Sequence, residues 1–235
     1  MDTQTRHALK TDSFVQATKT SVSWISDNRA QVIRWATIAA VVVILLGGGL
    51  TYWTIESSAA NKALGAALDI YTAPLAEPGA PAEIGVYTTA AERSKNANQQ
   101  FVAVAKQYNW LPEGTKAHYF AGVTFYELGQ TASAETELKA AAGSWNRNLS
   151  NLAKLALAGI YHDTGRDAQA IDIYKALAEK PSETVSAGVA QLDLADLYAA
   201  TGKQEQAREL WAKVKDKDKD GAAGSIAAQK LGAAQ

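Results

Sequence analysis

The chain contains no cysteine, which excludes disulfides, thiolate catalysis and cysteine-ligated metals. Its three histidines, His7, His118 and His162, are scattered, and none has a spacing that is used for metal binding. Glycine-rich phosphate loops and nucleophile elbows are also missing, because the glycines at 47–49 lie inside an apolar run. We therefore predict that the protein is not an enzyme and uses neither a metal nor a cofactor.

The chain has no excess of positive charge after its N-terminal quarter. Residues 1–55 contain five basic and three acidic side chains, which leaves 18 basic and 21 acidic side chains, a net charge of −3, for the rest. A domain with this balance lacks the electrostatic footprint of a nucleic-acid-binding protein. The sequence therefore predicts no nucleic-acid partner.

Residues 35–55, WATIAAVVVILLGGGLTYWTI, form a run with no ionisable side chain except Tyr52. As a helix, this run covers about 30 Å, which matches the hydrocarbon thickness of a bilayer. Trp35, Tyr52 and Trp53 stand at its ends, where aromatic rings favour the headgroup boundary. The run favours a transmembrane helix over a buried core helix, because a core helix of this length normally has a polar face.

A cleaved signal peptide is the other alternative, since the small residues at 57–60 resemble a cleavage site. However, the leader of 34 residues is long, and the apolar core exceeds the roughly 7–15 residues of a signal peptide. An uncleaved signal anchor is therefore the better interpretation.

The flanking charges predict the orientation of this anchor. Basic residues cluster before the run, whereas Lys62 is the only one between the run and Arg93. Positively charged flanks stay in the cytoplasm. We therefore predict a cytoplasmic segment over 1–34, a transmembrane helix over 35–55 and the remaining residues outside. In a bacterium this is a single-pass protein of the inner (plasma) membrane with a periplasmic domain.

Residues 56–114 are predicted to form a helical hairpin with a proline-rich insertion. Helical patterns over 57–71 and 88–110 flank a segment that holds Pro74, Pro78 and Pro81, three of the five prolines in the chain. Proline removes a backbone donor and blocks helix, so this segment is a loop. Whether the hairpin is a degenerate copy of the repeat described next is left open.

Residues 115–221 contain three copies of one pattern, aligned on the turn glycines Gly129, Gly165 and Gly202. In each copy a small residue stands seven positions before the glycine and an aromatic residue four before it. An alanine follows the glycine by five positions, and a large side chain follows it by nine. These positions are Gly122, Ala158 and Ala195; Phe125, Tyr161 and Tyr198; Ala134, Ala170 and Ala207; and Leu138, Tyr174 and Trp211.

This pattern resembles the tetratricopeptide repeat, although the first tryptophan of that repeat is replaced by His118, Lys154 and Gln191. Equal internal spacing in three units distinguishes it from an ordinary helical bundle. The resemblance implies an α-solenoid of tetratricopeptide-like hairpins. Together with the N-terminal transmembrane helix predicted from the apolar run, this makes the expected fold all-α. Neighbouring hairpins stack and the ends need caps, so residues 222–235 are predicted to be a capping helix with Ile226 and Leu231 facing inward.

In this repeat family the first helices of the hairpins line a concave groove, which implies a protein-binding site here. Its predicted residues are Tyr119, Val123, Tyr126, Leu152, Leu155, His162, Val189, Leu192 and Asp196. The set is more apolar and aromatic than charged, which suits an extended or helical peptide segment. The alternative is that the preceding hairpin or the final helix fills the groove and makes it core.

Residues 216–221, DKDKDG, copy the start of an EF-hand calcium loop. The twelfth position, which should be a bidentate glutamate, is Ala227, and interleaved lysines offset the acidic charge. We predict a solvated turn here.

In overall plan the chain also resembles the ancillary-subunit family of the Sec translocon, whose members join one span to a periplasmic repeat domain. The resemblance implies translocon subunits and periplasmic chaperones as partners, beside membrane lipid. The predicted function is a membrane-anchored protein-binding scaffold or chaperone-like adaptor. The alternative is a structural scaffold for cell-envelope assembly or cell division.

Overall fold

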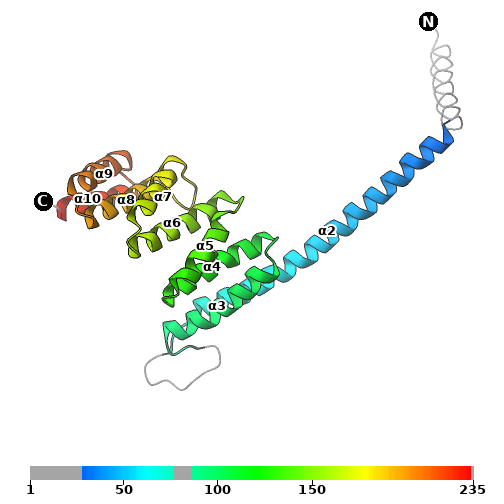
Figure 1. Ribbon diagram of the computed structural model, residues 1–235, viewed down its shortest axis with the longest axis horizontal. Coiled ribbons are helices and arrows are strands. Elements are labelled where there is room, and N and C mark those ends of the chain that lie inside the picture. Colours follow the sequence, from blue (N-terminus) through cyan, green and yellow to red (C-terminus); the bar gives the residue numbers. More distant parts are fainter. Residues whose placement is uncertain (1–27, 77–85, 234–235) are drawn as a thin grey trace, which may run out of the picture. The chain divides into compact units, whose positions relative to one another are not determined.

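The computed structural model describes residues 28–76 and 86–233, so most of the segment predicted to be cytoplasmic and most of the proline-rich loop lie outside the described ranges. The chain divides into two units, Met1–Ile55 and Glu56–Gln235. Helix α2, Arg29–Thr72, begins in the first unit and ends in the second (Figure 1). No described residue belongs to a named strand; one isolated bridge pairs Leu75 with Tyr87. The all-α fold is confirmed.

Eight further helices follow α2 in the second unit as it is described. They are α3 (Ala90–Gln107), α4 (Pro112–Glu127), α5 (Thr131–Ala142), α6 (Arg147–Asp163), α7 (Asp167–Glu179), α8 (Ala187–Ala200), α9 (Gln204–Lys217) and α10 (Ala222–Ala233).

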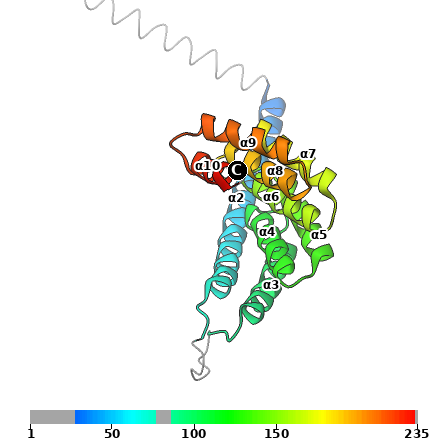
Figure 2. The ribbon, with the colours of Figure 1, turned by 90° about the vertical axis from the view of Figure 1, so that its left-hand side faces the viewer.

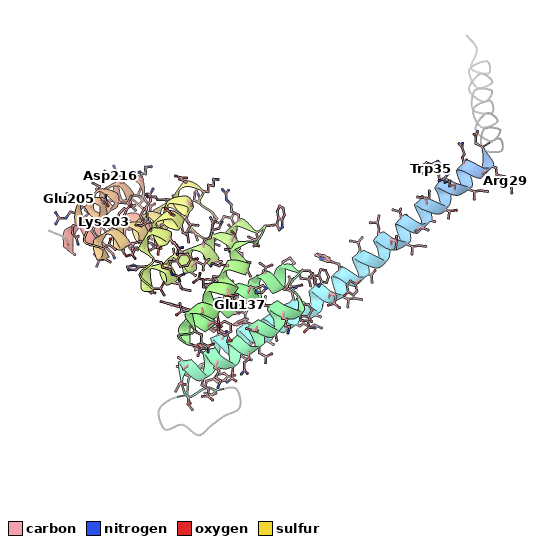
Figure 3. The ribbon with its side chains drawn as sticks, viewed as in Figure 1. Arg29, Trp35, Glu137, Lys203, Glu205 and Asp216 are labelled. Carbon is pink, nitrogen blue, oxygen red and sulfur yellow. The ribbon has the colours of Figure 1, made fainter. Side chains whose placement is uncertain are left out.

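The N-terminal part of α2 is long and apolar enough to cross a membrane. None of its most apolar window is buried, and Trp35 and Leu45 are each 68% exposed, so this part is not a core helix. Figure 3 shows Arg29 and Trp35 near its beginning. The hydroxyl of Thr51 donates to the Gly47 carbonyl at 2.9 Å, which satisfies a polar group that lipid could not.

The second unit begins with a hairpin formed by the C-terminal part of α2 and by α3. Ala60, Leu64 and Ala67 of α2 lie in one core cluster with Ala97 and Phe101 of α3. Outside this core, Thr89 caps α3, since its hydroxyl accepts from the backbone N–H of Glu92 at 3.1 Å. The same core cluster includes Ala117 and Ala121 of α4, and α3 packs against α4.

The three copies of the sequence pattern form the hairpins α4–α5, α6–α7 and α8–α9, and each helix from α3 to α10 packs against the next (Figures 1 and 2). Gly129, Gly165 and Gly202 have φ values of +72°, +73° and +78°, so all three turns use the left-handed conformation that glycine permits. The three alanines after these turns are fully buried. Helix α4 begins at Pro112, three residues before the predicted start of the repeats, since proline suits the first helical position.

Helix α10 caps the stack by packing on α8 and α9. Ala223 and Ala227 are buried, and Leu231 packs partly against the same cluster. Ile226 is 45% exposed, so the prediction that it faces inward is wrong. The inward stripe follows every fourth residue, 223, 227 and 231, and Ile226 lies outside this stripe.

Candidate functional site

The predicted groove residues lie on the first helices of the three hairpins, α4, α6 and α8, at very different depths. Tyr126 and Val189 are the most exposed, at 40% and 37% of their surfaces. Leu192 is buried, with 6% of its surface exposed. The remaining six are half-buried: Tyr119, Val123, Leu152, Leu155, His162 and Asp196.

Leu192 belongs to the core because α10 covers this end of α8. It lies in one cluster with Trp211 of α9 and Ala227 of α10. The neighbouring Asp196 accepts from the indole N–H of Trp211 at 3.1 Å and from Lys230 Nζ at 2.5 Å. In the third hairpin, therefore, the final helix occupies part of the predicted groove, and Leu192 contributes packing rather than binding surface.

Hydrogen bonds from tyrosine to carboxylate connect successive first helices. The hydroxyl of Tyr71, at the end of α2, donates to Glu127 Oε1 of α4 at 2.6 Å. One hairpin further on, the hydroxyl of Tyr126 in α4 donates to Asp163 Oδ2 of α6. Glu127 and Asp163 occupy the same repeat position, two residues before the turn glycine. The same type of contact thus recurs along the stack.

These hydroxyls remain donors at neutral pH. Burial and the hydrogen bond to Glu127 raise the pKa of Tyr71 to about 12. The hydrogen bond to Asp163, followed by burial, raises the pKa of Tyr126. The first helices of the hairpins therefore present apolar and phenolic side chains next to carboxylates that are held by hydrogen bonds. Such a surface can pack apolar groups and accept hydrogen bonds from peptide N–H groups.

The two histidines among the described residues, His118 and His162, each pair with one carboxylate. His118 Nδ1 lies 2.6 Å from Glu137 Oε2, and His162 Nδ1 lies 2.7 Å from Asp167 Oδ1; Figure 3 labels Glu137. In the acidic run after α9, Asp218 Oδ2 accepts from the backbone N–H of Gly224 at 3.1 Å. The structure as described contains no group of three or more histidine or acidic side chains that could hold a metal ion.

A profile of the family described as tetratricopeptide repeat-like domain matches residues 23–235. The match includes the apolar part of α2 as well as all the hairpins. The chain belongs to this family. Searches among the curated proteins and among the solved structures found no match. Tetratricopeptide-like domains are typically non-enzymatic modules of protein interaction, so this fold is that of a protein-interaction scaffold.

The tetratricopeptide-like domain has a second surface that the repeat pattern did not reveal. Trp110, between α3 and α4, and Trp145, between α5 and α6, line one cavity of about 520 Å³. Trp145 is exposed over its whole surface. Both tryptophans occur in turn sequences, NWLPEG and GSWNRN, outside the repeated core positions. That placement is the signal in the sequence that marks them as surface residues.

Proposed function

We propose that the chain is a single-pass protein of the bacterial inner membrane. In this proposal residues 1–34 are cytoplasmic, α2 crosses the membrane over residues 35–55, and the tetratricopeptide-like domain lies in the periplasm. The exposed apolar surface of α2 and the basic flank before it support this arrangement.

The continuity of α2 supports an uncleaved anchor. The small residues at 57–60 lie inside the helix, and Ala60 and Leu64 are buried in the core of the domain. Cleavage there would cut the helix in front of residues that the domain needs for packing. An anchor that stays attached agrees with this packing.

We propose further that the domain binds segments of other proteins along α4 and α6, as a chaperone-like adaptor near the Sec translocon. Tyr126 is the observation that carries the proposal, because its ring is exposed while its hydroxyl is held by Asp163. Leu152 and Val123 add half-buried apolar surface on the same two helices. An adaptor anchored in this way stands close to chains that leave the membrane.

Cysteine labelling in spheroplasts tests the orientation, since the chain has no cysteine of its own. Lys203, at the turn between α8 and α9, is exposed (Figure 3). A membrane-impermeant maleimide should label Lys203→Cys in intact spheroplasts and Thr11→Cys only after lysis. The reverse pattern would exclude a periplasmic domain.

Photo-crosslinking tests the binding surface. A photoreactive phenylalanine at Tyr126 of α4 should capture translocon subunits, periplasmic chaperones or exported chains. The matched control is Lys175, an exposed residue of the second helix α7. Equal capture from Lys175 would refute binding along the first helices. Capture of envelope-assembly or division proteins instead would favour a structural scaffold.

A further inference from the structure

Exposed tryptophans and basic side chains gather at one edge of the tetratricopeptide-like domain, where the connections between hairpins lie. Trp110 and Trp145 share the cavity of about 520 Å³. A neighbouring cavity of about 470 Å³ is lined by Trp145, Arg147, Lys154 and Lys180 and, among the described residues, by no acidic side chain. We refer to these five residues as the loop edge.

The three cations of the loop edge keep their charge available. None of Arg147, Lys154 and Lys180 forms an ion pair with a carboxylate of the described chain. Arg147 and Lys180 are exposed, and Lys154 is half-buried. Glu183 is an acidic side chain nearby, since it lines a further cavity with Arg147, but it forms no ion pair with these cations. A fully exposed indole beside cations without an ion pair is complementary to a membrane surface, which has anionic headgroups over an apolar interior.

The course of α3 places the loop edge level with the start of the second unit. Arg93 Nη1, near the beginning of α3, donates to the carbonyl of Ala73, just after the end of α2, at 3.0 Å. Tyr108, after the end of α3, lies in one core cluster with Ala60, near the start of this unit. The two helices are therefore antiparallel, and Trp110, two residues after Tyr108, lies close to the level of Ala60.

Ala60 follows Ile55 by five residues, which is about 8 Å along a helix. Ile55 is the last residue of the proposed span, and the headgroup layer beyond the hydrocarbon is about 5–8 Å thick on each side. Tryptophan and basic residues, the two kinds of side chain that make up the loop edge, are enriched at the headgroup layer of membrane proteins.

We propose that the loop edge is a membrane-docking surface, whose occupant is the anionic phospholipid leaflet of the membrane that holds α2. This inference rests on the proposed membrane anchor. Trp145 and Trp110 enter the headgroup layer, and Arg147, Lys154 and Lys180 bind lipid phosphates. Docking fixes the orientation of the domain relative to the bilayer. Because charge attraction is screened within about 8 Å at physiological salt, docking requires close approach.

Site-directed spin labelling of the full-length chain in nanodiscs tests the proposal. Ala140→Cys places a label on the cavity that Trp110 and Trp145 share, at an exposed alanine. Gln130→Cys, in the turn between α4 and α5, is the matched control, at the other end of α5. The nanodiscs contain phosphatidylcholine alone or equal parts of phosphatidylcholine and phosphatidylglycerol.

In the anionic discs we expect the label at 140 to collide several-fold less with a water-soluble nickel chelate, and more with oxygen, than the label at 130. Trp145→Ser and Arg147→Glu should each reduce this difference; both side chains are exposed, so neither change threatens the fold. If the nickel chelate collides equally with the labels at 140 and 130 in every disc, the loop edge is not a docking surface. The proposal is also overturned if the label at 140 is protected from the chelate only after another protein is added. Resistance to alkaline carbonate extraction reports separately on the anchor, so failure of the anchor and failure of docking are distinguishable.

Discussion

Gly122 of α4 lies directly against Leu138 of α5: a Cβ atom added to the glycine would stand 2.5 Å from Leu138 Cγ. The other two hairpins have Ala158 opposite Tyr174 and Ala195 opposite Trp211 at these repeat positions. All of these small residues are buried. Among the three repeat hairpins, α4–α5 is therefore the one in which the two helices approach so closely that even a methyl group does not fit.

We expect Gly122→Ala to destabilise the domain by about 1–3 kcal/mol, because overpacking displaces Leu138 and strains α5. Gly159→Ala is the matched control, since Gly159 is also helical and a Cβ there would meet no atom within 4 Å. The control should gain about 0.5–1 kcal/mol from helix propensity. Urea denaturation of both variants measures the difference, and equal stability would contradict the close approach.

Leu192 and Val189 test which predicted groove residues are core. Leu192→Ala should cost about 2–5 kcal/mol, because it leaves a cavity beneath α10. Val189→Ala should change the free energy of unfolding by less than about 0.5 kcal/mol, as expected for a surface side chain. Thermal unfolding followed by circular dichroism compares them. A mild effect of Leu192→Ala would mean that α10 does not cover α8.

Glu135 of α5 connects the hairpin α4–α5 to the hairpin α6–α7. This contact should make the stability of the domain sensitive to acid. Arg166 and Lys139 donate hydrogen bonds to it, at 2.7 and 2.6 Å, and lower its pKa to about 2. A lowered carboxyl pKa stabilises the folded state above the ordinary value near 4.5, and the stabilisation is lost as the pH falls toward 2.

We therefore expect Glu135→Gln to destabilise the protein by about 1 kcal/mol at pH 7, because exposure to solvent screens the pair. At pH 2.5 the difference from the wild type should be much smaller. Chemical denaturation at both pH values measures it. A constant difference would show that the charge of Glu135 plays no part.

Asp193 should act in the opposite direction. Burial, with a smaller contribution from the negative charge of Asp196, raises the pKa of Asp193 to about 6, and Lys230 opposes this rise. A raised carboxyl pKa means that ionisation costs stability above pH 6, and the cost disappears as the pH falls toward the ordinary value near 4.

Asp193→Asn should therefore raise the melting temperature at pH 7.5 and leave it nearly unchanged at pH 4. Differential scanning calorimetry at the two pH values provides the comparison, and Asp172→Asn, at an exposed residue of α7, is the control. A larger gain at pH 4 than at pH 7.5 would contradict the assigned direction.

The hairpins could be predicted from the sequence because their determinants are local. A turn glycine and a small residue facing a large one lie within about one repeat of each other, so the spacing itself records the contact. Gly165 and Ala170 illustrate this: their left-handed turn and complete burial follow from positions five residues apart. The apolar run over 35–55 is equally local, since hydropathy and length are properties of consecutive residues.

The binding surface could not be predicted in the same way. Leu155 and Leu192 occupy equivalent repeat positions, yet Leu155 is half-buried while α10 closes over Leu192. Tyr71 meets Glu127 across 56 residues and a proline-rich loop whose length carries no information about the pairing. The exposure of a side chain depends on which helix packs next to it in space. Sequence spacing therefore specifies the hairpins, whereas the stacking of hairpins and the final helix determines which of their faces remain open.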